Sequence, residues 1–134
     1  MIQKGILYLL VATLTASVTW AQKPVFQLLP PEKTGITFKN EIIETETHNI
    51  MEYEYFYSGG GVAVGDINND GLDDLFFTSN LKENKLYLNL GGLKFKDITL
   101  EAGVQGRTDD WNSGVSMADV NNDGLLDIFI CYMG

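Results

Sequence analysis

Two stretches of the chain repeat the same pattern of residues without a gap. The first runs over residues 61–77 and the second over residues 114–130, so the copies lie 53 positions apart. Each copy has an acid or an amide at positions 1, 3, 5 and 9 of a short loop, glycine at position 6, and apolar β-forming residues on both sides. A period of this length indicates a chain built from copies of one supersecondary unit, each of which buries its apolar face against the next.

The spacing of the oxygen-bearing residues suits a hard divalent cation. Ca²⁺ is held by about six to eight oxygen atoms, and alternate residues of a tight loop can point their oxygens inward. Gly71 and Gly124 allow the sharp turn that a β-carbon would obstruct. The alternative is a pair of polar turns that bind nothing, because Asn, Asp and Gly favour turns in any case. The predicted ligands are Asp66, Asn68, Asp70, Asp74 and the carbonyl of Leu72 in the first loop, and Asp119, Asn121, Asp123, Asp127 and the carbonyl of Leu125 in the second.

An EF-hand is the nearest competing calcium motif. Its twelve-residue loop ends in an acidic residue and is flanked by helices. Position 12 is Phe77 in one copy and Ile130 in the other, and the flanking runs are short and rich in β-forming residues. Both features argue against an EF-hand. Asp73 stands outside the ligand pattern, because Leu126 replaces it in the second copy.

The segment between the two loops predicts a β-hairpin. Residues 86–90 and 93–98 read as two strands joined by a turn at Gly91 and Gly92. Lys94 and Lys96 are expected on the outer face of this hairpin. Two strands around the ion loop and two in the hairpin make four strands per repeat. The predicted fold is therefore all-β, a partial β-propeller with one complete four-stranded blade and part of a second.

The first twenty-one residues have the layout of a secretory signal peptide. Lys4 precedes an apolar run, and the small residues Thr19 and Ala21 lie before a possible cleavage site. The alternative, a membrane anchor, is less suitable because the run is shorter than the roughly 20 residues of a spanning helix. The mature chain is therefore expected to be secreted, periplasmic or on the cell surface, without a membrane span.

Composition excludes several classes of function. The net charge is −9 and Arg107 is the sole arginine, which argues against nucleic acid as a partner. A single cysteine excludes an internal disulfide or a cysteine-based zinc site. Cys131 lies in an apolar run and is expected to be a small buried side chain rather than a nucleophile.

Residues 22–58 form a long connection into the first repeat. Residues 26–36 weakly echo residues 95–104, which predicts an outer strand followed by a connection. Alternation over residues 52–57 predicts a strand with its tyrosines on one face, either packed on a neighbouring blade or, with the acids of residues 41–57, open to a glycan or protein ligand. His48 is expected to be a solvated loop residue rather than an acid–base partner of a glutamate. Trp111 is expected to pack rather than to stack on a ligand.

Residues 61–74, with the sequences at 84–89, 95–99 and 102–104, resemble the FG-GAP/VCBS repeats of integrin-α-like β-propellers. They are similar to bacterial members, some of which carry an ASPIC/UnbV domain. The resemblance implies Ca²⁺ bound in the loops and a non-enzymatic role in adhesion or in recognition of a protein or glycan ligand. A propeller enzyme acting on polysaccharide and a scaffold for a downstream domain stay open as alternatives. The first repeat is placed at 59–111 and an incomplete second at 112–134, so the chain is expected to be a fragment of a longer protein.

Overall fold

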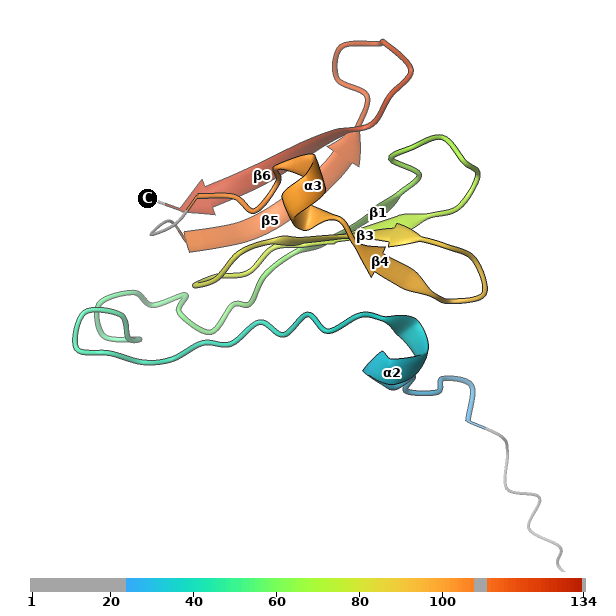
Figure 1. Cartoon of the computed structure of the whole chain (residues 1–134). Helices are drawn as coiled ribbons and strands as arrows, with labels where there is room; N and C mark the ends of the chain where they lie inside the picture. Colours follow the sequence, from blue (N-terminus) through green and yellow to red (C-terminus); the bar gives the residue numbers. More distant parts are fainter. Residues whose placement is uncertain (1–23, 108–110, 134) are drawn as a thin grey trace, which may run out of the picture.

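A computed structural model describes residues 24–107 and 111–133, and its centre is a four-stranded antiparallel sheet. The strands follow one another in chain order, as expected for short apolar runs separated by tight turns (Figure 1). This arrangement confirms the predicted four-stranded blade. The strands are β1 (Val62–Gly65), β2 (Asp74–Phe77), β3 (Lys85–Asn89) and β4 (Phe95–Asp97).

The second repeat forms a two-stranded antiparallel sheet that packs on one face of the first blade. It consists of β5 (Trp111–Ala118) and β6 (Asp127–Met133). The buried core of the blade is Ala63, Phe76 and Leu86, which come from three neighbouring strands. Apolar side chains of β5 and β6, together with two from the first repeat, pack against this core, so the two repeats share one hydrophobic interior. The partly buried members are Ile98, Val104, Val115, Met117, Ile128 and Ile130.

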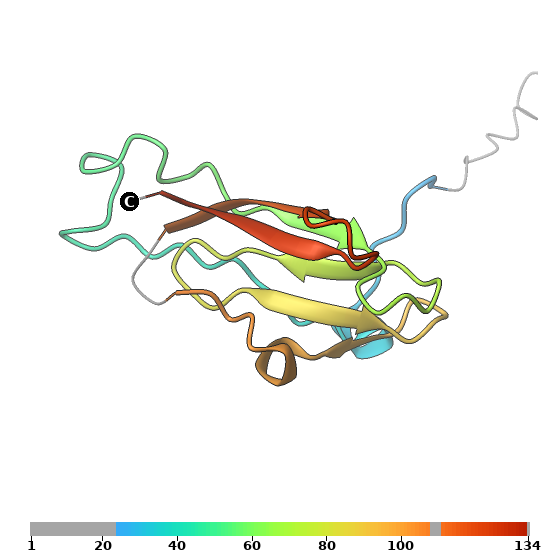
Figure 2. The same cartoon turned by 90° about the horizontal axis from the view of Figure 1, so that it is seen from above.

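The other face of the blade is partly covered, over β2 and β3, by the segment that precedes the first repeat. This segment runs below the sheet, opposite β5 and β6 (Figures 1 and 2). The ring of Phe38 stacks on Phe77, with centroids 4.8 Å apart. The Tyr87 hydroxyl accepts a hydrogen bond from the backbone N–H of Thr37 at 3.2 Å. The first blade is thus the middle layer of three.

Two one-turn helices support part of the expected echo between residues 26–36 and 95–104. Both α2 (Pro31–Thr34) and α3 (Thr99–Ala102) end at a glycine in the left-handed conformation, Gly35 and Gly103. The expected outer strand is wrong, however, because no strand occurs among described residues 24–58. Phe26 is 91% exposed in the structure, so this stretch has no neighbouring strand against which its apolar side chains could pack.

The predicted strand at residues 52–57 is also wrong, because this stretch forms consecutive turns. The Asn49 side chain accepts the backbone N–H groups of Met51 and Glu52, which starts the first turn. Phe56 is buried in place of the tyrosines, and Tyr55 and Tyr57 are exposed. The tyrosines therefore do not share one face of a strand.

Two smaller expectations are corrected. The turn of the β3–β4 hairpin is longer than two residues, because Leu90 N–H donates to the Lys94 carbonyl and Leu93 joins the glycines at positive φ. Cys131 is exposed rather than buried. It alternates along β6 with Ile128 and Ile130, which pack towards the core, and therefore points to the other face. Lys94 and Lys96 are exposed, as expected.

Candidate cation loops and a groove at the opposite end

The two repeated loops lie at the same end of the molecule. The first joins β1 to β2 and the second joins β5 to β6, and both views place them side by side (Figures 1 and 2). Asn69 and Asn122 take left-handed backbone conformations, with φ of 59° and 62°. Gly71 and Gly124 follow at 85° and 86°, which a side chain would disfavour.

The first aspartate of each loop makes the same two hydrogen bonds. Asp66 accepts the backbone N–H groups of Asp70 at 3.0 Å and Gly71 at 2.7 Å. Asp119 accepts the equivalent N–H groups of Asp123 and Gly124 at 3.1 Å and 2.8 Å. The N–H groups of Gly124 and Asp123 hold the pKa of Asp119 below its usual value, because they stabilise the charged carboxylate.

The middle of each loop is also the same in both copies. Asn68 donates from its side-chain nitrogen to Asp70 at 2.9 Å, and Asn121 donates to Asp123 at 3.0 Å. The backbone N–H at position 7 donates to the aspartate at position 5 in both loops. The two loops, whose sequences differ at several positions, therefore have the same pattern of hydrogen bonds in this part.

The aspartate at position 9 connects each loop to its sheet. Asp74 accepts the N–H of Ile67 at 3.0 Å, and Asp127 accepts the N–H of Val120 at 3.1 Å. Asp74 is fully buried and also accepts the N–H of Asn89 from β3 at 2.7 Å. A buried carboxylate needs such partners, since an unpaired one would be strongly destabilising.

The candidate donor atoms of each loop are of the type that binds a hard cation. All the candidate donors are oxygens, and each loop offers three carboxylates, an amide and a carbonyl. Each hydrogen-bonded carboxylate oxygen keeps a second lone pair. Within residues 24–107 and 111–133, however, no group of three or more His, Cys, Asp or Glu side chains gathers as a metal cluster. The carboxylates instead accept N–H groups of their own loop.

The two loops touch each other. The side-chain nitrogen of Asn69 donates to the carbonyl of Gly124 at 3.3 Å. A β-carbon on Gly65, at the end of β1, would lie 2.7 Å from the Leu126 side chain of the second loop. Leu126 therefore packs against the first repeat, which explains why leucine replaces the Asp73 of the first copy.

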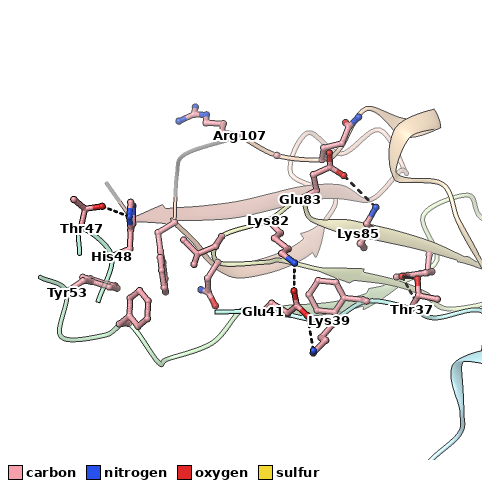
Figure 3. A pocket seen from close by; sticks show the side chains of 18 residues that line it. Thr37, Lys39, Glu41, Thr47, His48, Tyr53, Lys82, Glu83, Lys85 and Arg107 are labelled. Atoms are coloured by element: carbon pink, nitrogen blue, oxygen red, sulfur yellow. Dashed lines mark hydrogen bonds and ion pairs between the residues drawn. The ribbon is translucent and has the colours of Figure 1, made fainter. Parts of the chain in front are cut away.

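A groove of about 1350 Å³ lies at the other end of the blade (Figure 3). Its walls come from residues 37–56, the β2–β3 turn, strand β3, residues 105–107 and Trp111. Side-chain amides connect these walls. The buried Asn80 side chain donates to the carbonyls of Gly59 and Asn112 and accepts a hydrogen bond from the Asn40 side-chain nitrogen, and the Asn80 backbone N–H donates to the Asn40 side-chain oxygen.

Charged side chains meet in the middle of the groove. Lys39 and Lys82 both pair with the carboxylate of Glu41 (Figure 3). The hydrogen bonds from Lys39 and then Lys82 lower the pKa of Glu41 to about 2, since both ammonium groups favour its ionised form. This cluster could not be predicted from hydrophobic periodicity in the sequence, because its members lie in irregular segments.

Two residues singled out in the sequence also line the groove. His48 is exposed and forms hydrogen bonds with Thr45 and Thr47, in agreement with a solvated loop histidine. Trp111 packs against Tyr53 and Phe56, with ring centroids 5.4 Å and 5.1 Å away. Its packing role is therefore observed, although part of the residue is still open to the groove.

Comparisons with known proteins match the repeat region. The family model described as "FG-GAP-like repeat" matches residues 55–130. Cartilage acidic protein 1 of Xenopus tropicalis is 41% identical over 76 residues, and its human counterpart 38% over 73, each match covering 54% of this chain. Mouse integrin alpha-8 is 34% identical over 87 residues, covering 55% of this chain. The chain spans 11% of the first two relatives and 8% of the third.

No solved structure gives a significant match to the chain. In the part of the chain that the structure describes, no helix has the length and apolar character needed to cross a membrane. The expected signal peptide at residues 1–21 lies outside the described residues.

Proposed function

Because the chain belongs to the FG-GAP-like repeat family, we propose that it is part of an exported, non-enzymatic β-propeller that binds Ca²⁺ in two loops and recognises a protein or glycan ligand. Residues 59–111 form one repeat of this propeller, and residues 112–134 form part of a second. The relatives named an integrin and an acidic protein of cartilage support a recognition role. The signal-peptide layout of residues 1–21 supports export.

The agreement between the two loops is the observation that carries the cation proposal. Positions 1, 3, 5 and 9 have the same residue types in both copies, and the hydrogen bonds that they make within their own loops are the same. Asp66, Asn68, Asp70, Asp74 and the carbonyl of Leu72 would hold one ion, and Asp119, Asn121, Asp123, Asp127 and the carbonyl of Leu125 the other. Each ion would neutralise carboxylates that otherwise repel one another at short range.

We predict two Ca²⁺ ions per chain, measured by equilibrium dialysis with the protein at known concentration. Asp66→Ala and Asp119→Ala should each reduce the number to one, since each removes a carboxylate from one loop. Asp73→Ala changes the charge by the same amount but removes no proposed ligand. It should therefore keep two ions.

A count of two ions in Asp66→Ala would contradict the assignment of the first loop. Loss of an ion in Asp73→Ala would show that the register of the ligands is wrong. Circular dichroism spectra of all variants in Ca²⁺ should be compared first, so that loss of an ion is not confused with loss of the fold.

A further inference from the structure

A local excess of positive charge lies in the groove, although the chain as a whole is acidic. The chain has a net charge of −9, and its ion loops lie at the far end of the blade. In the part of the groove that the structure describes, Lys39 and Lys82 line the wall with a single carboxylate, that of Glu41, between them, and such a cluster attracts anionic ligands. Lys85 also lines the groove, but it pairs with Glu83 and Asp97.

The positive charge of Lys39 and Lys82 is only partly balanced by Glu41. One carboxylate serves two ammonium groups, which leaves a net positive charge at the centre of the groove. The side chains of Lys39 and Lys82 are 76% and 52% exposed, and ion pairs this exposed are weak. Both lysines can therefore turn towards an anionic ligand at low energetic cost.

Aromatic rings lie in the same groove as these charges. Trp111 and Tyr53 meet edge to face, and the indole of Trp111 also packs against the fully buried ring of Phe56. Of the aromatic residues that line the groove, Trp111 and Tyr53 are partly exposed. Rigid aromatic surface beside polar groups suits a ligand with one apolar face and many hydrogen-bonding groups. A sugar ring has both.

The walls of the groove favour a saccharide over a peptide. Peptides commonly add a strand to a free sheet edge or lay an amphipathic helix in an apolar groove. Strand β3, which contributes Lys85 and Tyr87, is already paired with β2 and β4, and most of the other lining residues lie in irregular segments and turns. The groove, of about 1350 Å³, has room for a ligand of more than one sugar ring.

We propose that this groove binds an acidic oligosaccharide, whose carboxylates contact Lys39 and Lys82 and whose sugar rings lie against Trp111 and Tyr53. The inference rests on the proposed recognition function and names its ligand class. It is independent of the cation, because the groove and the loops lie at opposite ends of the blade (Figures 1 and 3).

The probe is an oligosaccharide of alternating glucuronate and N-acetylglucosamine, and calorimetry measures its binding. The same oligosaccharide with its carboxyl groups reduced to alcohols is the matched neutral ligand. We expect the acidic form to bind at least about tenfold more tightly than the reduced form, and its affinity to fall with rising salt. Poly-L-glutamate should bind more weakly than the acidic sugar, because it offers charge without sugar rings.

The double variant Lys39→Gln/Lys82→Gln should weaken binding of the acidic oligosaccharide by about tenfold. The control Lys33→Gln/Lys94→Gln removes two exposed lysines outside the groove and should bind like the unchanged protein. Equal loss in both double variants would overturn the proposal, because it would show attraction by net charge alone. Equal binding of the reduced oligosaccharide, tighter binding of poly-L-glutamate, or no binding of the acidic form would also overturn it.

These outcomes separate the two proposals. A protein that binds the acidic oligosaccharide through Lys39 and Lys82 but takes up no Ca²⁺ refutes the cation part of the proposed function and leaves the groove assignment intact. A protein that takes up two Ca²⁺ ions but does not bind the oligosaccharide refutes the groove assignment alone.

Discussion

Replacing Gly61 with alanine should destabilise the protein by about 2–3 kcal/mol, whereas the same change at Gly114 should cost less than about 0.5 kcal/mol. The two glycines occupy the same position in the two repeats. A β-carbon on Gly61 would lie 2.8 Å from the backbone nitrogen of Val115 and 2.9 Å from the carbonyl oxygen of Ser113. The backbones of β1 and β5 would therefore have to separate.

Gly114 is a matched control because its surroundings have room. A β-carbon there would lie 3.7 Å from the sulfur of Cys131, an ordinary contact distance. Neither glycine has a positive φ, so the difference reports packing between the repeats rather than backbone strain. Urea unfolding of both variants measures the effect. Equal stability of the two variants would contradict the close approach of the repeats.

The second large effect is a rise in melting temperature with Ca²⁺. At a free concentration about a hundred times Kd, one bound ion stabilises the folded state by about 2.7 kcal/mol. For a domain of this size, that corresponds to a rise of roughly 5–15 °C relative to a chelator. Differential scanning calorimetry in 1 mM Ca²⁺ and in excess chelator measures it. Asp66→Ala/Asp119→Ala should abolish most of the rise.

Asp73→Ala provides the control for this experiment. It removes one exposed acid from the first loop but no proposed ligand, so the rise with Ca²⁺ should persist. A melting temperature that does not change between chelator and millimolar Ca²⁺ would refute the proposal that the loops hold this ion. A rise of the same size in the double variant would place the ion elsewhere.

The blade and the loops could be predicted because their signals are local. A loop with oxygen donors at fixed positions and a glycine at position 6 specifies its own backbone, and short apolar runs on both sides specify antiparallel strands. The β1–β2 pair and the β3–β4 hairpin accordingly appear where residues 61–77 and 86–98 predict them.

The segment before the first repeat could not be predicted in the same way. Alternation at residues 52–57 favours a strand, but no partner strand is available and Asn49 caps a turn instead. The exposed position of Cys131 depends on which face of β6 meets the blade, a tertiary property that an apolar run does not reveal. The groove joins residues such as Glu41 and Lys82 through tertiary packing, so neither segment signals it alone.

The equivalence of the two loops as cation sites is the central property proposed for this chain. The most direct test is an anomalous difference map from crystals of the protein grown in Ca²⁺, measured at a wavelength where calcium scatters anomalously. We predict two peaks per chain, one about 2.3–2.6 Å from oxygens of Asp66 and Asp70 and the other at the same distance from oxygens of Asp119 and Asp123. A map from such crystals with no peak in either loop would contradict the proposal that the loops are cation sites.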